Sequence, residues 1–139
     1  MPTLIDRLRK YIGDRRKSPR FTTHLEDTLP VLISLPNVSR DSKGHPVRLA
    51  GYTRDVSETG LGIIVQDVHI AGLEITRPGR RLIISLGLPS GPIEMQATTV
   101  RHTKIEESES ETSYLIGVQI VEMNKTARDY YLKFLNTLK

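Results

Sequence analysis

The segment VRLAGYTRDVSETGLGIIVQ, residues 47–66, indicates a β fold, because it holds two strand-like runs around a short polar turn. The runs, 47–54 and 60–66, are rich in the β-branched and aliphatic residues that favour strands. The turn supplies Asp, Ser and Gly, the residue types that reverse a chain. We therefore predict two strands joined by a turn.

Four more runs of the same kind lie around this pair. They are Val31–Leu35, Arg81–Leu86, Ile93–Ile105 and Tyr114–Glu122. Six short strands with no helix between them predict a mainly β protein, a small antiparallel barrel.

Two polar segments interrupt the strand pattern. We interpret Pro36–Pro46 as a long hairpin loop. Glu106–Thr112 carries four acids in seven residues, but it lacks the Gly and the ligand register of a calcium loop. We therefore expect a solvated hairpin tip there.

An amphipathic helix is predicted at each end of the chain. At the N-terminus, residues 3–12 place Leu4, Ile5 and Leu8 on one side, and Gly13 stops the helix. At the C-terminus, the helix 125–138 follows the N-cap Asn124. Its apolar stripe is Ala127, Tyr130, Tyr131, Phe134, Leu135 and Leu138. We expect the stripe to cover the open end of the barrel; a base-stacking platform is the less favoured interpretation. The expected division is therefore a helix at 1–13 and a single domain at 14–139.

The positive charge is confined to the N-terminus. Residues 1–20 hold seven bases and two acids, a balance of +5, whereas residues 21–139 hold 13 bases and 14 acids, a balance of −1. A protein that coats a long nucleic acid would spread its bases over a face. A small anionic partner near residues 15–20 is the better expectation.

Composition excludes several other classes. The absence of Cys rules out disulfides, thiol nucleophiles and thiolate metal sites. No apolar run approaches the roughly 20 residues that cross a bilayer, and no signal peptide is evident, so we expect a cytoplasmic protein without membrane insertion. The four His are 21 or more residues apart, and hydrolase and P-loop motifs are missing. An enzyme, a metal site and a bound cofactor are disfavoured.

The first local motif is Arg15-Arg16-Lys17-Ser18-Pro19-Arg20. A guanidinium offers a planar fork of donors that suits phosphate oxygens and the O6/N7 edge of guanine. Taken alone, the sextet is more often a solvated basic linker.

The second motif is Asp55-Val56-Ser57-Glu58-Thr59-Gly60. In extended backbone Asp55 and Ser57 point to one face, where a carboxylate can accept from the N1–H/N2 edge of guanine. Gly60 permits a tight turn and close approach of another group. Taken alone, this string is more often an ordinary turn.

Together the two motifs resemble the PilZ domain family, whose signature is RRxxxR followed by D/NxSxxG. They appear here as Arg15-Arg16-x-x-x-Arg20 and Asp55-x-Ser57-x-x-Gly60. The last strand, Gly117–Met123, and the helix after it also resemble the family. The resemblance covers roughly residues 14–138.

This resemblance implies a six-stranded antiparallel β-barrel of the PilZ type with a C-terminal helix, and a bacterial receptor for cyclic di-GMP. It implies that Arg16 and Arg20 bridge phosphates and guanine edges and that Arg15 adds a further contact. Asp55 would recognise the Watson–Crick/N2 side of a guanine, Ser57 would bind phosphate or base, and Gly60 would leave room for the ligand.

Three functions remain in order of preference. The first is a non-catalytic sensor in which ligand orders residues 14–20 and changes how helix 3–12 meets a protein effector. The second is a PilZ-fold adaptor that works by protein–protein contact without ligand. The third is a small RNA-binding barrel, which the near-neutral remainder, two Phe and no Trp disfavour. The sequence leaves open the regulated process, the ligand stoichiometry, the oligomeric state, the partner and whether the chain is a whole protein.

Overall fold

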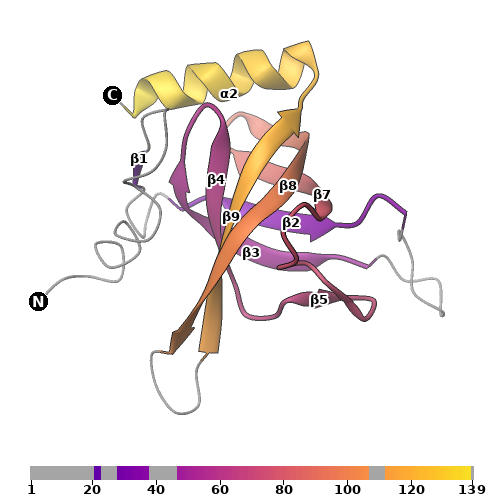
Figure 1. Cartoon of the computed structure of the whole chain (residues 1–139). Coiled ribbons are helices and arrows are strands. Elements are labelled where there is room, and N and C mark those ends of the chain that lie inside the picture. The colour runs from indigo at the N-terminus through magenta and orange to yellow at the C-terminus, as the bar shows by residue number, and fades with distance from the viewer. Residues whose placement is uncertain (1–20, 23–27, 38–46, 107–111, 139) are drawn as a thin grey trace, which may run out of the picture.

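A closed six-stranded antiparallel barrel forms the centre of the molecule (Figure 1). The computed structural model describes residues 21–22, 28–37, 47–106 and 112–138. The sheet order is β3-β2-β7-β8-β9-β4, and pairing of β3 with β4 closes it. These strands are β2 (Pro30–Ser34), β3 (Leu49–Val56), β4 (Gly60–Val65), β7 (Arg81–Leu88), β8 (Gly91–Glu106) and β9 (Thr112–Glu122).

Alternation of side chains explains the interior of the barrel. On β7, Leu82, Ile84 and Leu86 are fully buried while the residues between them are partly exposed, as the two-residue period of a strand requires. The core gathers such residues from all six strands. β4 differs, because every one of its residues is buried on both faces.

All six predicted strands are present, with bounds shifted by a few residues. The predicted hairpin tip at 106–112 is corrected at its ends: Glu106 and Thr112 pair with each other in β8 and β9. Strand pairing therefore continues through residues whose composition is that of a turn. The tip residues 107–111, the loop residues 38–46 and the predicted helix at 3–12 lie outside the described part of the chain.

Three short strands were not predicted. β1 (Phe21–Thr22) pairs with the end of β3, and β5 (His69–Ile70) pairs with β6 (Leu73–Glu74). Each has two residues, which is too short for an alternating pattern to appear in the sequence.

The C-terminal helix α2 (Lys125–Thr137) lies across one end of the barrel (Figure 1). It begins as predicted at Asn124, whose Oδ1 accepts from the Ala127 N–H at 2.8 Å. Ala127, Tyr131 and Leu135 are buried against the core. Tyr130 does not join them, since 47% of it is exposed. At about 100° per residue it falls at the edge of the apolar stripe.

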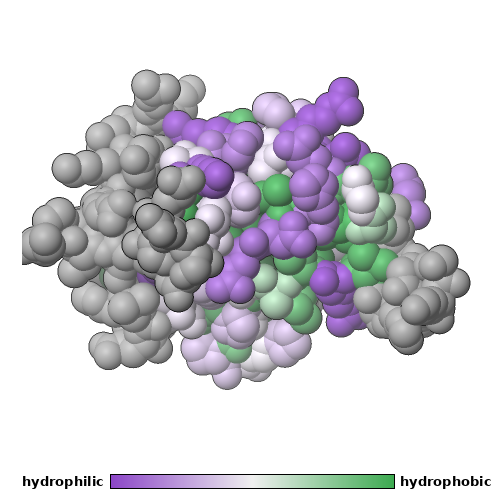
Figure 2. Space-filling view, turned by 90° about the horizontal axis from the view of Figure 1, so that it is seen from below, coloured by the Kyte–Doolittle hydropathy of each residue, from purple (hydrophilic) through white to green (hydrophobic). Residues whose placement is uncertain are grey.

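The opposite end of the barrel is less uniform. The strands β8 and β9 run on past the other strands there. Ile64, Ile105 and Leu115 form a second small cluster, against which Tyr52 packs. Figure 2 shows the molecule from this end, where apolar residues are interspersed with hydrophilic ones.

Candidate functional site

The turn between β3 and β4 is held closed by Ser57 and Gly60. The Ser57 N–H donates to the Gly60 carbonyl at 2.9 Å. The Ser57 hydroxyl donates to the same carbonyl at 3.2 Å and accepts from the Gly60 N–H at 3.1 Å. The side chain of Ser57 is therefore the brace of the turn, and it is fully buried.

Two neighbouring elements fix this turn from outside. The Tyr131 hydroxyl of α2 donates to the Ser57 carbonyl at 2.5 Å, in a buried position. The Ile120 N–H of β9 donates to the Thr59 carbonyl at 2.8 Å. The helix and the last strand thus hold the turn in one place relative to the barrel.

The turn does not use the left-handed backbone freedom of Gly60. Among the described residues, the glycines with positive φ are Gly72, Gly79 and Gly91. Gly60 has an ordinary strand backbone, so the turn does not need the left-handed region there.

Asp55 lies on the outer face of the barrel, one position after a bulge. The register of β3 against β4 shifts between Thr53 and Asp55, which makes Arg54 the extra residue. Asp55 pairs with Gly62 and is 3% exposed. The bulge aims Asp55 and Arg54 away from the core.

Arg54 is a feature that the sequence interpretation missed. It is fully buried, and its Cζ lies 5.3 Å from the centroid of the Tyr52 ring. A buried guanidinium is costly unless its surroundings compensate it, and an aromatic face is one such compensation. A single Arg within a strand carries no sequence signal of burial; the bulge that places it exists only in the paired sheet.

β1 brings the N-terminal segment to this turn. Phe21 pairs with Val56, and Thr22 pairs with Asp55. Phe21 follows Arg20 directly in the sequence. The structure thus brings Asp55, Ser57 and Gly60 together, while Arg15, Arg16 and Arg20 lie outside the described residues.

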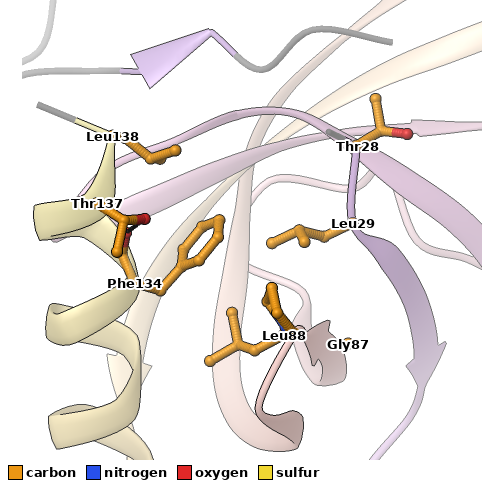
Figure 3. A pocket seen from close by; sticks show the side chains of 8 residues that line it. Thr28, Leu29, Gly87, Leu88, Phe134, Thr137 and Leu138 are labelled. Carbon is orange, nitrogen blue, oxygen red and sulfur yellow. Dashed lines mark hydrogen bonds between the residues drawn. The ribbon is translucent and has the colours of Figure 1, made fainter. Parts of the chain in front are cut away.

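A separate hollow of about 510 Å³ lies between the end of α2 and the barrel (Figure 3). Phe134 and Leu138 point across it toward Leu29 and Leu88. It is lined by Thr28, Leu29, Gly87, Leu88, Pro89, Phe134, Thr137 and Leu138. This lining contains no charged side chain, so the hollow does not suit an anion.

Other kinds of site are absent from the described part of the chain. Its residues include no group of three or more His, Asp or Glu side chains that could hold a metal ion. No helix within the described ranges is long and apolar enough to span a membrane.

Solved structures with this fold come from several bacteria. The PilZ domain of YcgR from Escherichia coli with c-di-GMP is 16% identical, with a TM-score of 0.62, over 89% of this chain and 91% of that chain. The K. pneumonia MrkH–c-di-GMP complex is 22% identical, with a TM-score of 0.66, over 89% of this chain and 51% of that chain. PlzA of Borreliella burgdorferi in complex with c-di-GMP is 11% identical, with a TM-score of 0.57, over 96% of this chain and 57% of that chain. At such identities the likeness establishes the fold.

The comparison with protein families is more specific. A search of curated proteins found no significant match. The family model described as "PilZ domain" matches residues 14–136, a range that contains both motifs, the barrel and almost all of α2. The chain therefore belongs to the PilZ domain family.

Proposed function

We propose that the chain is a bacterial receptor for cyclic di-GMP that binds its ligand between the N-terminal arginine motif and the β3–β4 turn. The pairing of β1 with β3 carries the proposal, because it tethers the end of the first motif beside the second. The family supports it, as do the three structural neighbours above, whose structures are described with c-di-GMP.

The arginines are the proposed clamp. Arg16 and Arg20 bind the phosphates and the Hoogsteen edges of the guanines, and Arg15 adds a stacking or phosphate contact. A guanidinium is permanently charged and pairs with two acceptors at once, which suits both groups. The excess charge of residues 1–20 lies where this clamp needs it.

The turn is the proposed floor. Asp55 accepts from the N1–H and N2 amino group of a guanine, and Gly60 leaves room for the ligand. Ser57 contributes mainly by bracing the turn, since its donor is used on the Gly60 carbonyl. Its hydroxyl retains one further lone pair with which it can accept from the ligand.

Ligand binding orders residues 14–20 against the barrel and thereby changes how residues 3–12 meet a protein effector. Ordering a segment on binding is a common switch, and its entropic cost comes from the binding free energy. The receptor is cytoplasmic and catalyses no reaction.

Calorimetry with cyclic di-GMP tests this function and also gives the stoichiometry. A hydrogen bond to a charged group contributes about 1.5–3 kcal/mol, which is roughly 10- to 100-fold in affinity. Because each arginine makes several such contacts, we expect Arg16→Ala and Arg20→Ala to nearly abolish binding. Arg48→Ala, which removes an exposed charge just before β3, is the control and should bind like the wild type. Wild-type affinity in either clamp variant would refute the clamp.

One observation favours an adaptor that acts by protein contact alone. Asp55 and Ser57 are already buried without ligand, as in a turn that serves only the fold. A folded wild-type protein that gives no calorimetric signal with cyclic di-GMP would establish this alternative.

A further inference from the structure

The hollow between the C-terminal end of α2 and the barrel leaves apolar side chains partly uncovered (Figure 3). Leu29 and Leu88 on the barrel side are buried, whereas Phe134 and Leu138 on α2 are only half-buried. Phe134 and Leu138 pack against the core and also point across the hollow. Partly exposed apolar surface is stabilised when another apolar group covers it. The hollow therefore suits an apolar segment.

The strand β1 lies close to this hollow, along one edge of β3. β4 pairs with Asp55 and Val56 on the other edge of β3, so β1, which pairs with the same two residues, shares its edge with β2. Leu29 contacts this edge at Thr53, through hydrogen bonds of 2.9 and 3.0 Å. From Thr53 to Val56 is three strand positions, roughly 10 Å. Figures 1 and 3 both show β1 beside the C-terminal end of α2.

The chain that precedes β1 is long enough to return to the hollow. Residues 13–20 span up to about 26 Å when extended, more than twice the distance along β3. Residues 3–12, for which the sequence predicts an amphipathic helix, would form a rod of about 15 Å. The apolar side of that helix carries Leu4, Ile5 and Leu8. This segment therefore has both the reach and the apolar surface that the hollow requires.

The charges near the hollow favour the same occupant. α2 has no basic residue in its last turn, so no side chain of that turn balances the partial negative charge of the C-terminal carbonyls. At about 100° per residue, Arg7 and Arg9 border the two sides of the apolar stripe in residues 3–12. A helix that lies with its stripe in the hollow thus brings a guanidinium to the end of α2.

We propose that residues 3–12 dock in this hollow as a helix of the same chain when no ligand is bound. Their apolar stripe lies against Phe134, Leu138 and Leu88. Docking covers the apolar side with which this segment would meet an effector, so the docked segment is withheld from partners. The contact itself does not depend on cyclic di-GMP.

Disulfide trapping in the ligand-free full chain tests this contact, because the chain has no Cys of its own. Thr137 lines the hollow and is exposed, so Thr137→Cys places one thiol at its edge. Leu8→Cys places the second thiol on the apolar side of residues 3–12, and Lys10→Cys, on the opposite side, is the matched control. A disulfide requires the two Cα atoms to come within about 7 Å. We expect the Leu8 pair to close within one chain about 10-fold faster, or more, than the Lys10 pair.

Two further variants keep the test decisive. Leu4→Cys, one helical turn from Leu8, should also close faster with Thr137→Cys than the Lys10 control does. Thermal melting under reducing conditions checks that each variant is folded. If Thr137→Cys is not folded, Pro89→Cys replaces it, because Pro89 is exposed on the barrel side of the hollow.

The outcomes are distinct from those for the receptor. Equal rates for the apolar and control pairs would overturn the docking, because the tether alone would then bring the thiols together. Disulfides that form between chains would also overturn it, since the occupant would be a second copy. A wild type that closes the Leu8 pair as expected but gives no calorimetric signal with cyclic di-GMP would uphold the docking and refute the receptor.

Discussion

At the scale of single residues, the site depends on hydrogen bonds that the polar side chains make inside the fold. Ser57 is the clearest case, since its hydroxyl serves both backbone groups of Gly60. Tyr131 then fixes the Ser57 carbonyl from the helix. The residues nearest the proposed ligand are thus held before the ligand arrives, which lowers the entropic cost of binding.

Ser57→Ala should lower the free energy of unfolding by about 1–3 kcal/mol, because the buried Gly60 N–H loses the acceptor it has in Ser57. Denaturant unfolding measures the change. Ser85→Ala, on the outward face of β7, is the control and should lower the free energy of unfolding much less. Equal losses in the two variants would contradict the role of Ser57 as a brace.

Tyr131→Phe should also lower the free energy of unfolding by about 1–3 kcal/mol, since it leaves a buried carbonyl without its donor. The adjacent residue provides a matched control, because Tyr130 is exposed. Tyr130→Phe should leave the midpoint of denaturant unfolding almost unchanged. If the two variants unfold at the same denaturant concentration, the buried hydrogen bond does not stabilise the turn.

At the scale of elements, the ends of strands and helices place the site. The bulge in β3 turns Asp55 outward, and β1 ties the N-terminal segment to the same strand end. α2 then covers the barrel end and contacts the turn. Because α2 contacts the turn, the stability of its first turn bears on the site.

Asn124→Ala should destabilise the protein by about 1 kcal/mol, because the Ala127 N–H loses its capping acceptor. Asn136→Ala removes the same side chain from an exposed position near the end of α2 and should be neutral or slightly stabilising, since Ala has the higher helix propensity. Thermal melting compares the two. A greater loss at position 136 would contradict the assigned helix start.

At the scale of the whole molecule, ligand binding and stability are linked. A ligand that binds only the folded state at 100 times its Kd adds about 2.7 kcal/mol to the free energy of unfolding. We expect cyclic di-GMP to raise the melting temperature of the wild type and not that of Arg20→Ala. Equal rises in both would show that the dinucleotide binds elsewhere.

The proposed division of the chain makes a further prediction. Removing residues 1–13 should leave the affinity for cyclic di-GMP nearly unchanged, because both motifs and β1 remain. Removing residues 1–20 should nearly abolish it, since the arginines are lost. Calorimetry on the two truncated proteins, each checked by melting, distinguishes them. A large loss already in the shorter truncation would place part of the binding site in residues 1–13.

The barrel, the C-terminal helix and the family could all be predicted from the amino-acid sequence. Runs of β-branched and aliphatic residues between turn residues mark the long strands, with regular alternation in β7, and Asn124 marks the helix start because a cap is a local interaction. The motif around Asp55 was readable for the same reason, since its spacing is local.

Contacts between residues that are distant in the sequence became visible only in the folded barrel. Strand pairing created the bulge at Arg54, and it joined the two-residue β1 to Asp55. Packing of α2 on the barrel brought the Tyr131 hydroxyl to the Ser57 carbonyl, 74 positions away. Register between strands and contacts between elements depend on the closed barrel as a whole, and no local pattern of residues encodes them.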